Sequence, residues 1–317
     1  MPQPSRTALP WARSTFITSV FLLGAGALLA QFVSNTRLVE LHASVVNRKG
    51  QLITNLPRDA FKVYENGQPQ VIKIFKQEDV PVSLGIIIDD SGSMQSKRQG
   101  VEAAALAMVR ASNPQDEVFI VNFNDDAYLD VPFTSDIRKM EQGLARIDSR
   151  GGTAMRDAIN MSLDYMKAQA KRDKKVLMVI TDGNDNASLV SLEKVVMRAN
   201  QSGTLIYAIG LFSDEDRHEA TKAKRALNEL TSASGGVAYY PKSLTEVSGL
   251  ALEVAKDIRN QYTIAYSPSI QDLDGSYRQI KVVCNAPGKP TVRTRSGYYA
   301  TPEANTPSKQ ASITRPS

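Results

Sequence analysis

Cysteine and histidine are scarce in this chain, and their scarcity removes several kinds of site. Cys284 is the only cysteine, so the chain can form no internal disulfide and no cysteine-based structural zinc site. Its apolar neighbours predict a strand, which favours a buried, inert thiol over a reactive one. The two histidines, His42 and His218, lie in a predicted strand and at an exposed helix start. Neither position suits catalysis or zinc ligation, so we expect packing or surface roles for both.

The sequence also lacks the usual signatures of serine hydrolysis and of nucleotide binding. No G-x-S-x-G elbow surrounds Ser91 or Ser93, and no G-x-x-x-x-G-K loop is present. The formal net charge is only +5 in 317 residues, and the basic excess is spread along the chain. It gives no reason to expect nucleic acid as a partner. With 42% hydrophobic residues, the chain can bury a sizeable core.

The two ends of the chain differ in composition from the rest. Residues 14–36 carry no charge and are mostly apolar, and Arg6 and Arg13 precede them. This pattern is typical of an export signal, but the stretch is nearly long enough to serve as an uncleaved membrane anchor. We expect residues 1–33 to be a signal peptide or anchor, and the protein to be periplasmic, at the cell surface or secreted. Residues 300–317 lack periodicity and are predicted to be a disordered tail.

Between residues 81 and 260, apolar runs alternate with segments whose apolar residues recur every three or four positions. This alternation predicts an α/β fold with a doubly wound, mostly parallel sheet. The expected strands are residues 82–88, 118–123, 128–131, 175–180, 204–209 and 237–240. Too few residues separate the second strand from the third for a parallel crossover, so the third is expected to be an antiparallel edge.

Short predicted strands flank this α/β domain on both sides, in an N-terminal β segment (37–80) and a C-terminal one (261–299). Within the first, Asn66-Gly67 predicts a hairpin between residues 61–64 and 71–75. Isolated β ribbons are only marginally stable. We therefore expect the two flanking segments to pair into a small β-sandwich, with the α/β domain as an insertion between them.

Oxygen-bearing side chains follow two of the predicted strands and precede one predicted helix. They are Asp89, Ser91 and Ser93 after the first strand of the α/β domain, Thr153 after Gly151-Gly152, and Asp182 within Thr181-Asp182-Gly183. Because open α/β sheets bind ligands at the carboxyl ends of their strands, we expect these three loops to close one site. Hard cations such as Mg²⁺ prefer oxygen ligands in an octahedral array.

The pattern D-x-S-x-S, then an isolated Thr, then T-D-G, resembles the metal-ion-dependent adhesion site of von Willebrand factor type A domains. The resemblance implies a Rossmann-like domain that binds Mg²⁺, Mn²⁺ or Ca²⁺. It implies that the hydroxyls of Ser91, Ser93 and Thr153 are direct ligands. It also implies that Asp89 and Asp182 balance the charge, partly through water.

Such a donor set leaves the charge of the ion poorly neutralised, so an open coordination position would attract an acidic side chain from a partner protein. Residues 59–67 and 261–298 add a likeness to an exported bacterial subgroup, the VWFA-related acidobacterial domain family. We therefore expect an exported, non-enzymatic binding protein, with no catalytic residues, that recognises a protein ligand through a divalent metal.

An alternative is a magnesium-dependent phosphohydrolase of the haloacid-dehalogenase type, with Asp89, Asp182 and Asp185 in catalytic roles. That chemistry needs a second acid two residues after the nucleophilic aspartate, where this sequence has Ser91, or Gly92 if the neighbouring aspartate leads. A third reading is a scaffold in which the motif survives as a turn and binds no metal.

Other polar residues near these loops are expected to have structural roles. Asp185, Asn186 and residues 124–126 could rim the ligand surface, but capping or turn hydrogen bonds are favoured for them. Asp90 is expected to face away from the ion as a solvated carboxylate or a hydrogen-bond acceptor. Asp116 is expected to be a turn residue without a further role.

Overall fold

In the computed structural model, which describes residues 37–144, 150–183, 185–212 and 217–302, six strands form a central sheet. Their order is β10 (Ala238–Tyr239), β9 (Leu205–Gly210), β8 (Lys174–Thr181), β5 (Val82–Asp89), β6 (Glu117–Phe123) and β7 (Ala127–Thr134). Only the β6–β7 pair is antiparallel, which confirms the predicted edge strand. All eight residues of β5 are buried, as expected for a strand covered on both faces.

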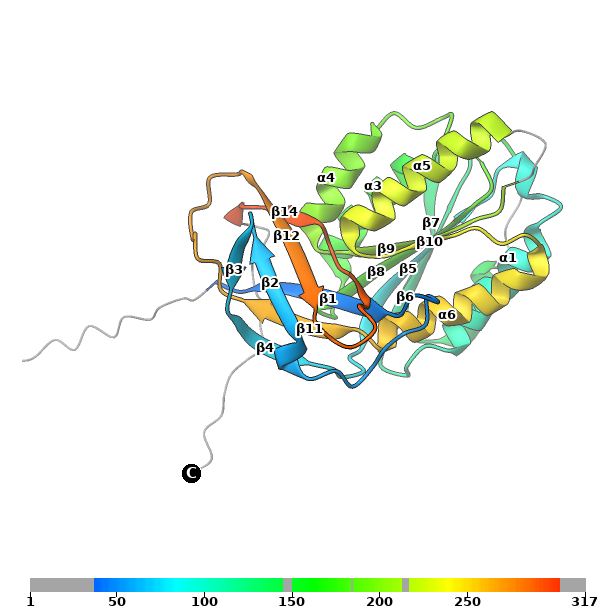
Figure 1. The fold of residues 1–317 in the computed structure, drawn as a ribbon. Coiled ribbons are helices and arrows are strands. Elements are labelled where there is room, and N and C mark those ends of the chain that lie inside the picture. The colour runs from blue at the N-terminus through cyan, green and yellow to red at the C-terminus, as the bar shows by residue number, and fades with distance from the viewer. Residues whose placement is uncertain (1–36, 145–149, 184, 213–216, 303–317) are drawn as a thin grey trace, which may run out of the picture. The chain divides into compact units, whose positions relative to one another are not determined.

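Helices cover both faces of this sheet (Figure 1). One face carries α1 (Arg98–Arg110), α2 (Ile137–Leu144) and α6 (Val247–Arg259), and the other carries α3 (Met155–Gln169), α4 (Leu192–Ser202) and α5 (Arg217–Ser234). Short 3-10 helices, η1 (Arg58–Ala60), η2 (Gly92–Met94) and η3 (Leu244–Glu246), lie in connections. The α/β fold class predicted from the sequence is confirmed.

The flanking segments form two further sheets of four strands each within the described residues. One has the order β13 (Thr291–Arg293), β1 (Val39–Val46), β11 (Tyr262–Tyr266) and β4 (Ile72–Lys76). The other has the order β14 (Gly297–Tyr299), β12 (Tyr277–Cys284), β2 (Phe61–Glu65) and β3 (Gln68–Gln70). Strands from before and after the α/β domain pair in both sheets, as the sequence predicts. Their apolar faces meet in one core, where the Cys284 thiol is buried.

The expected hairpin within the N-terminal segment is partly wrong. Asn66-Gly67 does make a tight turn with positive φ at both residues, but it joins β2 to the three-residue strand β3. The chain then crosses to the opposite sheet at the exposed Val71, and β4 pairs with β11. This crossing allows Ile72 to enter the core between the two sheets, where it is 7% exposed.

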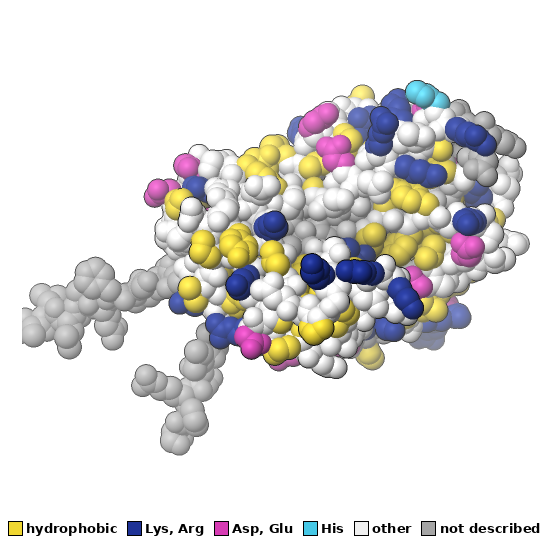
Figure 2. Space-filling model, in the orientation of Figure 1, with side chains coloured by type: hydrophobic (Ala, Val, Ile, Leu, Met, Phe, Trp, Pro, Cys, Tyr) yellow, Lys and Arg dark blue, Asp and Glu magenta, His cyan; other side chains and the backbone are white. Residues whose placement is uncertain are grey.

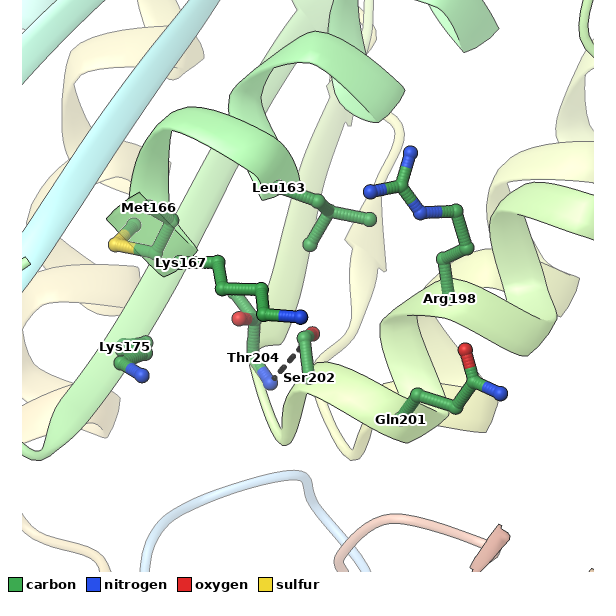
Figure 3. A pocket seen from close by; sticks show the side chains of 8 residues that line it. All are labelled: Leu163, Met166, Lys167, Lys175, Arg198, Gln201, Ser202 and Thr204. Atoms are coloured by element: carbon green, nitrogen blue, oxygen red, sulfur yellow. Dashed lines mark hydrogen bonds between the residues drawn. The ribbon is translucent and has the colours of Figure 1, made fainter. Parts of the chain in front are cut away.

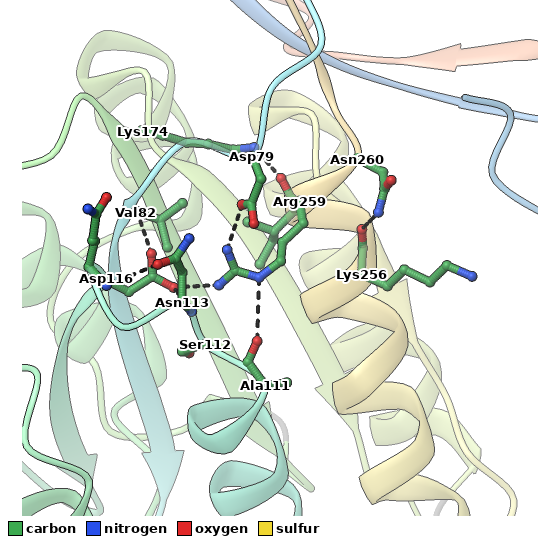
Figure 4. A network of polar contacts seen from close by, with 12 residues as sticks. Asp79, Val82, Ala111, Ser112, Asn113, Asp116, Lys174, Lys256, Arg259 and Asn260 are labelled. Atoms are coloured by element: carbon green, nitrogen blue, oxygen red, sulfur yellow. Dashed lines mark hydrogen bonds and ion pairs between the residues drawn. The ribbon is translucent and has the colours of Figure 1, made fainter. Parts of the chain in front are cut away.

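A polar network centred on the buried Asp116 fixes the end of α6 against the starts of β5 and β6 (Figure 4). The Arg259 guanidinium forms ion pairs with Asp79 and Asp116. The Asp116 carboxylate, 1% exposed, also accepts hydrogen bonds from the backbone N–H groups of Val82 (2.9 Å) and Asn113 (2.8 Å). Asp116 is therefore more than the turn residue expected from the sequence, because it connects three segments.

The sandwich packs against the end of the central sheet where the parallel strands begin. Gln261 donates hydrogen bonds at 3.1 Å to Tyr207 Oη of β9 and to Ser44 Oγ of β1. On the other side, the backbone of Ser296 donates to the carbonyl of Ala233 at the end of α5. The loops predicted to hold a metal leave the opposite end of the sheet. The limits of the domains, as set from the sequence, stay a prediction.

Several predicted features lie outside the described residues, namely the export or anchor segment and residues 303–317 of the expected tail. Ala300, at the start of that tail, is instead buried and its backbone N–H donates to Ser276. Within the part of the chain that the structure describes, no helix combines the length and the apolar character needed to cross a membrane. Figure 2 shows basic side chains in a broken band across one face, with apolar and acidic side chains between them.

Candidate metal centre

The first predicted metal residue, Asp89, ends strand β5 and is 1% exposed. Its Oδ1 accepts a hydrogen bond from the backbone N–H of Ser91 at 2.9 Å, and its Oδ2 accepts one from the hydroxyl of Thr181 on the neighbouring strand β8. Burial raises the pKa of Asp89 from 3.8 to about 6, although these hydrogen bonds lower it and the nearby Asp182 charge raises it further. The carboxylate is thus held in place by the loop that follows β5 and by the end of β8.

Ser91, Ser93 and Asp182 form a chain of side-chain contacts beside Asp89. The 3-10 turn η2 brings the two serine hydroxyls to 3.2 Å from each other, and Ser93 Oγ donates to Asp182 Oδ1 at 2.8 Å. The other oxygen of Asp182 contacts the ammonium group of Lys97. The side chain of Asp182 is 1% exposed, whereas Ser93 is exposed to solvent. The site therefore opens to solvent on its serine side.

Thr153 approaches the same place from the loop before α3. A Cβ atom added to Gly183 would lie 3.2 Å from Thr153 Oγ1, so this hydroxyl faces the residue that follows Asp182. The backbone N–H of Gly92 donates to the carbonyl of Gly151 at 3.2 Å. This bond ties the loop that carries Ser91 and Ser93 (the serine loop) to the loop that carries Thr153 (the threonine loop). The structure thus brings all five predicted metal residues together, although their role in binding a metal stays a prediction.

Residues treated as turn formers in the sequence hold the threonine loop in position. Asn186 Oδ1 accepts the backbone N–H of Thr153 at 2.9 Å, and Asp125 Oδ1 accepts that of Gly152 at 2.8 Å. Gly151 has φ +75°, and an added Cβ would collide with the Asp125 carboxylate. A glycine is therefore required there. The favoured turn role agrees with these contacts, but the sequence did not reveal that the turns converge on Thr153.

Asp90 and Lys97 also lie near these loops, and the sequence predicted a role for the first of them only. Asp90 points away from the cluster and accepts a hydrogen bond from Tyr128 Oη at 3.1 Å, and it is buried rather than solvated. Lys97 was missed altogether. The available signal was a cation four residues after Ser93, followed directly by Arg98 and placed where η2 leads into α1.

The donor set fits a hard divalent cation. Two carboxylates and three hydroxyls supply only oxygen, the ligand type that Mg²⁺ and Ca²⁺ prefer. Among the described residues no group of three or more His, Cys, Asp or Glu side chains is placed to hold a metal, so the hydroxyls are essential to any site here. The Lys97 ammonium on Asp182 shows that positive charge is stabilised at this point.

A separate cavity of about 250 Å³ lies between α3, α4 and the starts of β8 and β9 (Figure 3). Lys167, Lys175 and Arg198 line it, but the Arg198 guanidinium already pairs with the Asp164 carboxylate. This cavity is at the opposite end of the sheet from the candidate metal centre, so it takes no part in that site.

Comparisons with known proteins point to one family. Residues 84–184 match the family model of the von Willebrand factor type A domain. An uncharacterized protein of Borreliella burgdorferi is 27% identical over 174 residues, 53% of this chain and 49% of that protein. Integrin alpha-11 of Mus musculus is 29% identical over 122 residues, 37% of this chain and 10% of the integrin. The aligned regions thus span half or less of these relatives.

A solved structure described as von Willebrand factor type A from Catenulispora acidiphila superposes with a TM-score of 0.51 at 12% identity. It covers 85% of this chain and 75% of its own. The likeness to the acidobacterial subgroup stays a prediction. The family match lies within the central sheet and its helices and includes both the serine loop and Asp182. The central α/β domain of this chain belongs to the von Willebrand factor type A family.

Proposed function

We propose that this protein is an exported, non-enzymatic binding protein whose type A domain recognises a protein partner through a divalent metal. Domains of this family serve in adhesion and protein interaction. The observation that carries the proposal is the convergence of Asp89, Ser91, Ser93, Thr153 and Asp182 at one end of the sheet. Mg²⁺ is the expected ion, with Mn²⁺ and Ca²⁺ as substitutes.

The charge balance of this set supports an acidic ligand. Asp89 and Asp182 would balance the charge of a divalent ion partly through water, and the three hydroxyls that bind it directly add no charge. A metal bound largely by neutral oxygens remains strongly electrophilic, so a carboxylate from a partner would complete its coordination. The exposed Ser93 marks the side from which such a carboxylate would approach.

The phosphohydrolase alternative is not favoured. A nucleophilic aspartate must present a free oxygen to the phosphorus atom, whereas Asp89 is 1% exposed and both of its oxygens accept hydrogen bonds. The position two residues later is Ser91, which cannot act as the general acid of that mechanism. Magnesium-dependent hydrolysis of a phosphomonoester that Asp89→Asn abolishes would restore the alternative.

Isothermal titration calorimetry with MgCl₂ and MnCl₂ tests the metal site. The wild-type protein is expected to release or absorb heat on binding, and Asp89→Asn and Ser93→Ala are expected to lose most of that signal. Asp126→Asn is the matched control, because it removes a carboxylate from an exposed loop near the same end of the sheet. Absence of binding by the wild-type protein would overturn the proposal.

Affinity capture from envelope extract tests the partner. A partner held through the metal is expected to elute with EDTA and to be lost from the Asp89→Ala variant. Capture that survives both treatments would contradict metal-dependent recognition. N-terminal sequencing of the protein from the same envelope fraction would show whether residues 1–33 are cleaved or kept as an anchor.

A further inference from the structure

We infer that Lys97 sets the net charge of the candidate metal centre, so that it weakens cation binding and strengthens the attraction of the loaded site for an anionic ligand. The inference rests on the proposed function, because it needs a divalent ion at the cluster. It assigns to Lys97 a role in specificity that neither the motif nor the family match contains.

The two oxygens of Asp182 face different neighbours. Oδ1 accepts the hydrogen bond from Ser93 Oγ, on the side where the predicted ligands gather, and Oδ2 contacts the Lys97 ammonium. A cation held on the serine side therefore leaves the contact with Lys97 in place. The side chain of Lys97 is 21% exposed and that of Asp182 1%, so water screens this pair only weakly.

The position of Lys97 in the chain is unfavourable unless Asp182 compensates for it. Lys97 is the N-cap of α1, where its backbone carbonyl accepts from Gly100 and Val101. Its side chain makes no cap, and the first turn of α1 has no acidic residue. A positive side chain at a helix N-terminus is repelled by the helix dipole. The contact with Asp182 offsets that cost and directs the charge toward the metal centre.

The consequence follows from counting formal charges. Asp89 and Asp182 neutralise a divalent ion, so the loaded site would be neutral without Lys97 and carries +1 with it. The same ammonium repels the incoming cation. Lys97 therefore lowers the affinity of the site for the metal ion and raises the affinity of the loaded site for a carboxylate. Its removal is expected to shift these two affinities in opposite directions.

Lys97→Gln tests the inference, because glutamine keeps a hydrogen-bond donor for Asp182 but removes the charge. Lys97→Met is a second neutral variant, and Lys97→Arg keeps the charge. Lys62→Met, on an exposed position of β2 in the sandwich, is the matched control. Calorimetric titration with MnCl₂ is expected to show binding about tenfold tighter for both neutral variants, and near wild-type binding for the arginine variant and the control.

The second measurement uses acetate as the anionic probe. Relaxation of the acetate methyl protons by protein-bound Mn²⁺ reports how much acetate reaches the ion, and this effect is expected to fall several-fold in Lys97→Gln. If the wild type binds Mn²⁺ and the folded neutral variants bind it equally or more weakly, the inference is wrong while the proposed function stands. If the wild type binds no Mn²⁺, both fail.

Discussion

Replacing Asp89 with asparagine is expected to stabilise the metal-free protein while it removes metal binding. Asp89 is 1% exposed, and burial raises its pKa from 3.8 to about 6 despite two hydrogen bonds. Keeping this carboxylate ionised inside the folded protein therefore costs free energy. A pKa rise from 3.8 to about 6 corresponds to about 3 kcal/mol. Asparagine has nearly the same shape and no charge, so it avoids that cost.

The direction of the Asp89 pKa shift determines how the difference in stability between the variant and the wild type depends on pH. The folded protein binds the Asp89 proton more tightly than the unfolded chain does, so the associated stability is complete below pH 3.8 and is lost as the pH rises through about 6. The free energy of unfolding of Asp89→Asn minus that of the wild type is therefore expected to be small at pH 4 and about 3 kcal/mol at pH 7. Titrating groups that do not interact with Asp89 cancel in this difference, whereas the repulsion between Asp89 and Asp182 is part of it.

Urea denaturation in EDTA between pH 4 and pH 8 measures the difference. Asp126→Asn, which removes the same charge from an exposed loop, is expected to show no pH-dependent gain. Saturating Mg²⁺ should reverse the order, because an ion at 1,000 times its Kd adds about 4.1 kcal/mol to the wild type alone. An asparagine variant that is less stable than the wild type at pH 7 in EDTA would refute the reasoning.

Three further predictions concern residues that support the fold and the site. Arg259→Met is expected to lower the free energy of unfolding by about 2–4 kcal/mol in urea titrations, because it leaves the buried Asp116 charge with backbone donors only. Asp79→Asn changes a half-exposed carboxylate and should cost under about 1 kcal/mol. Burial lowers the pKa of His42 to about 3, helped by nearby positive charges, so stability should fall as the pH drops below 6.5, and His42→Gln should remove that part of the acid sensitivity. Asn186→Ala is expected to weaken Mn²⁺ binding about tenfold in calorimetry, without unfolding the protein, because it frees the threonine loop.

The sequence predicts the central sheet well because burial on both faces produces long apolar runs. β5 and β8 are such runs, and the strands found in the structure differ from the predicted ones mainly at their ends. The same logic predicts that Asp89 and Asp182 meet, since their strands are parallel neighbours and both residues stand at the carboxyl ends. Local pattern and global topology agree at these positions.

Contacts between segments far apart in the chain could not be predicted in the same way. Asp116 reads as a turn former because its bond to Asn113 is local, while its partner Arg259 is 143 residues away. Lys97 reads as an ordinary surface cation, because nothing in its own helix indicates that it turns toward Asp182. Pairs of this kind depend on which strand ends come together, and hydrophobic periodicity carries no information about individual ionic partners.

The two ends of the central sheet of the α/β domain have different neighbours. The sandwich contacts the strand starts, and Arg37 and Thr301 near the ends of the described chain meet on that sandwich at 3.5 Å. The candidate metal centre lies beyond the eight residues of β5, which span about 26 Å. The sandwich and the candidate metal centre therefore lie at opposite ends of the central sheet.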